Sequence, residues 1–196
     1  MSILALTSDT LIGTPATGNL EYNGQFFGTD SAGSRAQLQR LTLSTAVAST
    51  SGTSINFTSI PAWVKRFTVM FSGVSTSGTS IVQIQLGSGS VTTTGYTASA
   101  SYGTAVGQFG DATTGFVIEP SASATAGAVR YSSVIFSLLS ANTWVSQGNL
   151  YTTATNPNIT NVGKISLSGV LDRVRITTVN GTDTFDAGTV NIMYEG

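Results

Sequence analysis

Apolar and polar side chains alternate along much of this chain, which is the pattern of β-strands with one buried face. In residues 63–73 the odd positions include Trp63, Phe67, Val69 and Phe71, and polar residues occupy most of the even ones. The same signal predicts further strands over residues 81–86, 129–139, 143–151, 165–171, 174–179 and 190–194.

The segment 81–86 also predicts what its two faces contact. Its apolar residues share one face, whereas Gln83 and Gln85 share the other, so we expect the two glutamines to face solvent. Gly87-Ser88-Gly89-Ser90 follows directly. It lacks the Gly-Lys-Ser/Thr ending and the helix of a phosphate-binding loop, so a hairpin turn is the better interpretation.

Two Asn-Gly dipeptides add turn geometry. Asn23-Gly24 and Asn180-Gly181 each follow a strand pattern, and Asn-Gly tolerates the positive φ angles of a type I′ turn. Each therefore predicts a β-hairpin. Helix signals are nearly absent, since the one weak candidate, residues 30–40, contains Ser31 and Gly33 and favours nothing longer than a turn.

The predicted fold is all-β. Without crossover helices antiparallel pairing is favoured, and the spacing of strands and turns is typical of a β-sandwich. We expect an N-terminal arm with a β-hairpin over residues 1–45 and a jelly-roll-like antiparallel β-sandwich over residues 46–196.

Composition narrows the function. The chain of 196 residues has 9% charged residues, a net charge of −1, and neither His nor Cys. These facts exclude imidazole bases, Cys nucleophiles, disulfides and His or Cys metal sites, so we expect no catalytic residues, no metal and no cofactor. We also expect no nucleic-acid partner without a basic surface, no membrane insertion without a long apolar stretch, and no signal peptide.

Ser, Thr and Gly together make 79 of the 196 positions. Thr suits the solvent face of a strand, but a neutral face lacks the charges that prevent edge-to-edge association. This composition favours a protein whose neighbours cover its edges, and therefore an oligomer.

The carboxylates offer no obvious catalytic pair. A glycosidase needs two carboxylates about 5–10 Å apart, and no spacing selects a pair among Glu21, Asp111, Glu119, Asp172 and Glu195.

Two smaller groups of charges leave alternatives open. Asp183 and Asp186 would hold Ca²⁺ or, more simply, stabilise a turn. Arg173 and Arg175 share a strand face and would form a small anion-binding patch, face solvent, or pair with Asp172 of a neighbouring subunit.

The aromatic residues divide by pattern. Trp63 and Trp144 lie in strand patterns and are expected in the core. Tyr96 and Tyr102 lie in a segment rich in Gly, Ser and Thr, so we expect them to be exposed and able to stack on sugar rings.

Several stretches resemble structural proteins of tailed bacteriophages. Residues 18–27, Gly-Asn-Leu-Glu-Tyr-Asn-Gly-Gln-Phe-Phe, followed by Gly33-Ser34-Arg35, resemble a small hairpin module of tail-fibre and other virion proteins. Residues 60–66 and 171–185 resemble β-sandwich domains of the same proteins, whereas residues 96–128 resemble none of them. The chain is too short to contain the shaft of a long fibre.

The resemblance implies a non-enzymatic virion protein made in the host bacterial cytoplasm. It implies a short fibre or tail appendage, expected to be a homotrimer, that contacts the host surface or anchors an adjacent fibre. The arm would dock onto other virion proteins through Leu20, Tyr22, Phe26 and Phe27. The alternatives are a capsid decoration or head-fibre protein, and a carbohydrate-binding module that holds a host surface glycan with Tyr96 and Tyr102.

Overall fold

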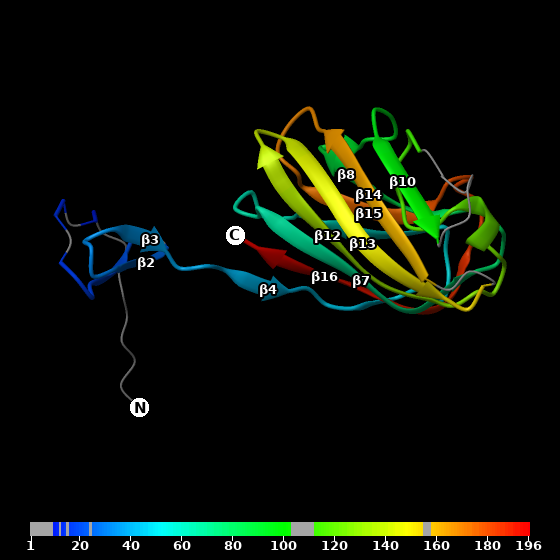
Figure 1. Ribbon diagram of the computed structural model, residues 1–196, viewed down its shortest axis with the longest axis horizontal. Helices are drawn as coiled ribbons and strands as arrows, with labels where there is room; N and C mark the ends of the chain where they lie inside the picture. Colours follow the sequence, from blue (N-terminus) through cyan, green and yellow to red (C-terminus); the bar gives the residue numbers. More distant parts are fainter. Residues whose placement is uncertain (1–9, 12, 15, 24, 103–111, 155–157) are drawn as a thin grey trace. The chain divides into compact units, whose positions relative to one another are not determined.

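The computed structural model is all-β and divides into two compact units, Met1–Arg40 and Leu41–Gly196 (Figure 1). It describes residues 10–196 except 12, 15, 24, 103–111 and 155–157. The second unit begins five residues earlier than the pattern predicts. The reason is that Leu41–Leu43 pairs with the last strand of the chain, with Met193 opposite Leu43.

The N-terminal unit contains one three-stranded antiparallel sheet. The hairpin predicted at Asn23 is present, with Tyr22 opposite Phe26. Three residues separate these partners instead of the two of a type I′ turn, and the middle one, Gly24, lies outside the described residues. The next hairpin turns at Asp30, whose Oδ1 accepts the backbone N–H groups of Ala32 and Ser34. The strands are β1 (Leu20–Tyr22), β2 (Phe26–Thr29) and β3 (Arg35–Gln37).

The larger unit contains an eight-stranded and a five-stranded antiparallel sheet. The first has the order β10-β14-β13-β12-β7-β16-β4, with β5 also paired to β16. Its strands are β4 (Leu41–Leu43), β5 (Val47–Ala48), β7 (Arg66–Thr76), β10 (Thr97–Tyr102), β12 (Arg130–Ser140), β13 (Thr143–Thr152), β14 (Asn158–Ser166) and β16 (Phe185–Glu195).

The second sheet has the order β11-β8-β15-β6, with β9 also paired to β8. Its strands are β6 (Ser54–Thr58), β8 (Val82–Ser88), β9 (Ser90–Val91), β11 (Phe116–Val117) and β15 (Arg173–Thr178). A 3₁₀ turn, η1 (Ser121–Ser123), is the only helical element among the described residues. In Figure 1 the long strands of the larger sheet cross in front of β8 and β15. The two layers confirm the predicted β-sandwich, whereas the jelly-roll-like connection stays a prediction.

One hydrophobic core lies between the two sheets. Phe136 of β12 stacks on Phe67 with ring centres 4.6 Å apart and meets the edge of Phe116, from the opposite sheet, at 5.1 Å. The predicted alternation in β7 is confirmed, since Phe67, Val69 and Phe71 are all buried. Trp144 is buried in the core, and Trp63, just before β7, packs against it.

Two predicted elements are wrong. Asn180-Gly181 forms a turn, closed by the bond from the Gly181 N–H to the Thr178 carbonyl. It does not join a hairpin, because β15 before it and β16 after it belong to different sheets. The strand predicted at 165–171 instead spans Asn158–Ser166, because β14 pairs with β13 only as far as Ser166 opposite Thr143.

The hairpin turn predicted at Gly87–Ser90 is confirmed, with Ser88 opposite Ser90 and Gly89 at φ +71°. The solvent exposure predicted for Gln83 and Gln85 is wrong, since both are buried, with exposed fractions of 2% and 3%. Thr114 covers this face of β8. Its hydroxyl donates to Gln83 Oε1 over 3.0 Å, and its carbonyl accepts from Gln85 Nε2 over 2.7 Å.

Candidate interaction surfaces

Four of the five carboxylates considered above as catalytic candidates lie in the described residues, and each forms an ion pair with an arginine. Three of the contacts are short, at 2.7–2.8 Å, and the one between Arg66 and Glu195 measures 3.6 Å. A carboxylate held in an ion pair is a poor general acid. Asp111 lies outside the described residues. The pairs are Glu21–Arg35, Glu119–Arg130, Asp172–Arg173 and Glu195–Arg66.

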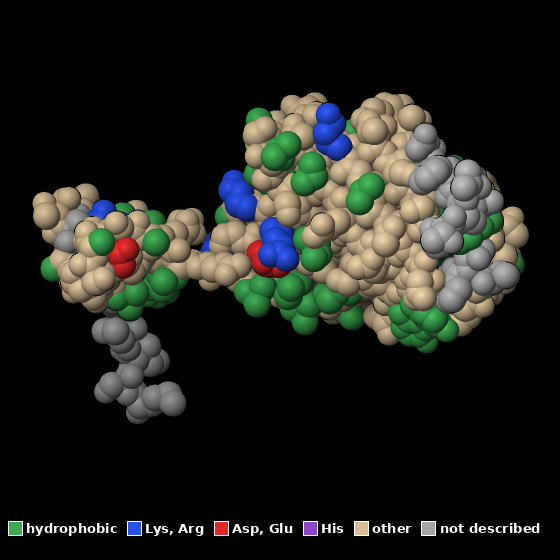
Figure 2. Space-filling view, in the orientation of Figure 1, with side chains coloured by type: hydrophobic (Ala, Val, Ile, Leu, Met, Phe, Trp, Pro, Cys, Tyr) green, Lys and Arg blue, Asp and Glu red, His purple; other side chains and the backbone are tan. Residues whose placement is uncertain are grey.

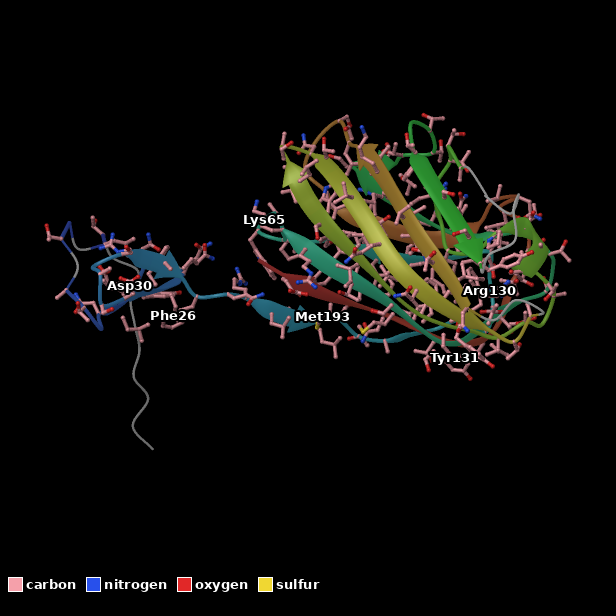
Figure 3. All side chains as sticks on the ribbon, in the orientation of Figure 1. Phe26, Asp30, Lys65, Arg130, Tyr131 and Met193 are labelled. Carbon is pink, nitrogen blue, oxygen red and sulfur yellow. The ribbon has the colours of Figure 1, made fainter. Side chains whose placement is uncertain are left out.

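The Glu119–Arg130 pair is the most deeply placed, because both side chains are completely buried. Arg130 Nε donates to both Glu119 oxygens at 2.8 Å, and its Nη1 donates to the Ala128 carbonyl. Burial raises the pKa of the Glu119 carboxyl, and the Arg130 charge offsets part of that rise. Figure 3 shows Arg130 at the end of the sandwich beside Tyr131, whose side chain is half exposed. The pair is therefore a structural feature of the core.

Asp183 and Asp186 stabilise local structure. Asp183 accepts from the Ser80 N–H and from Asn180 Nδ2, and Asp186 accepts from the Ser75 hydroxyl. Within the described ranges no three His, Cys, Asp or Glu residues come together as metal ligands do. The turn interpretation fits Asp183, whereas Asp186 lies in β16 and bonds to Ser75 of the neighbouring strand β7.

Arg173 and Arg175 share a strand but have different partners. Arg173 donates to Asp172 of the same chain at 2.7 and 3.1 Å, and these bonds lower the pKa of the Asp172 carboxyl. Asp172 therefore already has an arginine partner within its own chain and needs none from a neighbouring subunit. Arg175 is held by the neutral side chain of Gln85.

The sugar-stacking site predicted at Tyr96 and Tyr102 is wrong for Tyr96. Its side chain is 2% exposed, and its ring meets the edge of Phe116 at 5.1 Å. Its hydroxyl donates to the Thr92 carbonyl and accepts from the Leu86 N–H, which fixes it between β8 and the segment before β10. Burial raises the pKa of Tyr96 to about 12. Tyr102 is partly buried against the same core.

The predicted docking residues of the N-terminal unit divide between two faces of its sheet. Leu20 and Tyr22 are two residues apart in β1 and therefore share one face of the sheet. Phe26 lies opposite Tyr22 on the same face, with the two ring centres 5.0 Å apart. Leu38, which sequence reasoning missed, continues this face, since its N–H bonds to the Phe26 carbonyl. Phe27 lies opposite Glu21 and therefore faces the other way. We call Leu20, Tyr22, Phe26 and Leu38 the N-terminal apolar face.

The N-terminal apolar face is not covered by the described residues of its own unit. Leu20, Phe26 and Leu38 are exposed, and Figures 2 and 3 show apolar side chains gathered on the side of the unit where Phe26 lies. A hollow of about 440 Å³ opens beside Tyr22, Phe26 and Leu38. Among the described residues of this unit only Glu21 and Thr29 are buried, and both are polar. The described residues of this unit therefore form no hydrophobic core of their own.

A second apolar surface lies on the larger sheet. Leu41 and Leu43 of β4 are 64% and 62% exposed, and Met193 on β16 lies opposite Leu43. Figure 2 shows apolar side chains gathered over β4 and β16, where Figure 3 labels Met193. β4 is an edge strand, so one side of its backbone has no neighbour in this sheet among the described residues. We call Leu41, Leu43 and Met193 the β4 edge surface. The sequence pattern missed it because β4 is only three residues long.

Comparison with family models, with curated proteins and with solved structures finds no match to this chain. A search of the described residues for a helix of sufficient length and apolar character to cross a bilayer finds none.

Proposed function

We propose that this chain is a non-enzymatic structural protein of a tailed-phage virion, a short fibre or tail appendage that docks through its N-terminal unit. The observation that carries the proposal is the N-terminal apolar face on a unit without a hydrophobic core. A unit of this size rarely stays folded without disulfides, a metal or a partner, and this chain has no Cys. A partner surface supplies the missing burial.

The chemistry of the face defines the partner. Leu20, Tyr22 and Phe26 offer aliphatic and aromatic contact area, and β1–β3 form a short open sheet to which a partner strand can add. The opposite side of the sheet carries the Glu21–Arg35 ion pair and is less suited to an apolar partner. The partner is therefore a virion protein with an exposed strand edge and an apolar surface next to it.

The β4 edge surface supports self-association of the sandwich. Edge strands of monomeric proteins usually contain a charged residue or a proline that blocks edge-to-edge pairing. β4, with the sequence Leu-Thr-Leu, contains neither. We infer a homotrimer in which this surface lies between subunits. Sedimentation of the whole chain tests the inference. Leu43→Lys should shift the trimer to monomer, whereas Val162→Lys, at an equally exposed position of β14, should not.

The virion assignment is tested on particles. In phage assembled with the wild-type chain, the chain should copurify with particles in a fixed copy number, and a particle reconstruction should show it on the tail. Phe26→Ser should remove it from particles, whereas Val170→Ser, an exposed apolar position of the larger unit, should leave it bound. A chain found on the capsid would favour the decoration alternative, and a chain absent from particles would overturn the proposal.

A further inference from the structure

A groove of about 280 Å³ lies on the outer face of the five-stranded sheet. Gln83 and Gln85 of β8 and Arg175 and Thr177 of β15 line it, and their neighbours Ile84 and Ile176 point to the core on the other face. Thr114 borders it opposite β15. The volume is near the lower limit of small-ligand pockets.

The polar side chains at the base of the groove are held in fixed positions. Gln83 accepts from the Thr114 hydroxyl, and Gln85 donates to the Thr114 carbonyl. Gln85 Oε1 in turn accepts from Arg175 Nε at 2.8 Å and Nη2 at 2.5 Å. Both glutamines are buried, so the network determines the orientation of the Arg175 guanidinium before any ligand arrives.

Arg175 differs from the arginines in ion pairs. Arg35, Arg66, Arg130 and Arg173 each contact a carboxylate, whereas Arg175 contacts a neutral amide oxygen and has no carboxylate partner among the described residues. A guanidinium has five N–H donors, and the bonds to Gln85 use two of them. The remaining donors form the planar fork that a carboxylate accepts best.

The surrounding charges favour an anion at this place. Among the described residues that line the groove, Arg175 carries the only formal charge. Asp183 does not line the groove, and its oxygens accept from the Ser80 N–H and from Asn180 Nδ2 at the rim. Asp172, near the other end of β15, is occupied by Arg173.

The rim of the groove consists of hydroxyl and amide groups. Thr53, Ser54 and Thr93 border it with hydroxyl groups that can donate and accept. The Thr177 hydroxyl already donates to the Thr53 carbonyl, and the Asn180 amide is bonded within its own turn. A ligand with several hydroxyl groups and one carboxylate matches this arrangement. We propose that the groove binds an acidic sugar, whose carboxylate pairs with Arg175 and whose hydroxyl groups bond to the Thr and Ser side chains. This site does not depend on the place of the chain in a particle.

The test titrates the purified whole chain with sodium glucuronate, glucose and sodium propionate, and follows backbone amide shifts by NMR. Glucuronate should bind at least about tenfold more tightly than either of the other two. Glucose lacks the carboxylate that pairs with Arg175, and propionate lacks the hydroxyl groups. The shifts should fall on β8 and β15. Equal binding of propionate would overturn the sugar part of the proposal, and equal binding of glucose would overturn the carboxylate part.

Variants of the same strand supply the control. Arg175→Gln should weaken glucuronate binding about tenfold or more, and Arg175→Lys, which keeps the charge but not the fork, should weaken it less. Arg173→Gln, two residues away and paired with Asp172, should bind as the wild type does. Circular dichroism would verify that each variant is folded. Failure of the wild type to bind glucuronate at about 50 mM, or undiminished binding by both Arg175 variants, would overturn the site.

Discussion

The two units of this protein use the same strand chemistry with opposite results for burial. In the larger unit two sheets bury one another's apolar faces, and aromatic residues such as Phe136 and Phe116 join the layers. In the N-terminal unit one small sheet has no second layer among the described residues, so Tyr22 and Phe26 meet each other but remain accessible. We therefore expect the larger unit to be stable by itself and the N-terminal unit to depend on the proposed partner for burial of its apolar face.

Each unit contains a Glu–Arg ion pair, and the two pairs differ in burial as the units do. Glu119–Arg130 lies in a completely buried position, whereas in Glu21–Arg35 the arginine side chain is 23% exposed. Solvent can replace the second pair's hydrogen bonds but cannot reach the first. Substituting matched residues in the two units should therefore change their stabilities by different amounts.

Removing an aromatic ring should have the largest effect. Phe136→Ala opens a cavity beside Phe67 and Phe116 and should lower the free energy of unfolding of the sandwich by about 3–5 kcal/mol. Phe26→Ala removes an exposed ring and should leave that transition unchanged, although it should weaken docking. Urea unfolding followed by Trp fluorescence measures both. A comparable loss in the two variants would contradict the proposed difference between the units.

Neutralising a carboxylate should have a somewhat smaller effect. Glu119→Gln leaves the Arg130 charge buried without a counter-charge and should cost the sandwich about 3 kcal/mol. Glu21→Gln, in the more exposed pair, should change stability by about 1 kcal/mol or less. Urea unfolding followed by Trp fluorescence measures the first variant, and amide hydrogen exchange of β1–β3 measures the second, since Trp63 and Trp144 both lie in the larger unit. An equal, small cost would show that water reaches the Glu119 pair.

The third effect depends on pH and belongs to the sandwich alone. The unfolded chain releases the Tyr96 proton near pH 10, whereas the folded chain keeps it up to a pKa of about 12. Stability should therefore fall as pH rises from 10 to 12, by about 3 kcal/mol in total. Tyr96→Phe should lose this part of the pH dependence.

At neutral pH Tyr96→Phe should lower the free energy of unfolding by about 1–3 kcal/mol, because the Leu86 N–H loses its partner. Thermal unfolding across the alkaline range gives both quantities. An unchanged alkaline slope in Tyr96→Phe would assign the pH dependence to another group.

The sequence predicted those elements whose pattern is long and regular. β12 and β13 bury alternate residues as expected, because one face of each packs on the core. β7 does so over Phe67–Phe71, except that Thr68 is buried too, and Val74–Thr76 are all buried. The hairpin between β12 and β13 was not predicted at its turn. Its two-residue loop is Ala141-Asn142, with Ala141 at φ +46°, and no Gly or Asn-Gly marks it.

Other predictions failed where the tertiary context decides the outcome. Alternation correctly puts Gln83 and Gln85 on the outer face of β8, but it contains no information about Thr114, which covers them. For the same reason the position of Tyr96 in a segment rich in small polar residues indicated exposure, although its ring fills the core beside Phe116. Of the docking residues, Leu20, Tyr22 and Phe26 share a face as their strand spacing implies, and Phe27 does not.

Native-state hydrogen exchange of the purified whole chain tests the contrast between the units most directly. The amides of β7, β12 and β16 should exchange only through global unfolding of the sandwich. Those of β1–β3 should exchange with little protection, at most about 1 kcal/mol, since no core holds them. Protection of β1–β3 equal to that of β7, and unchanged in Phe26→Ala, would contradict the account, because the N-terminal unit would then be stable without a partner.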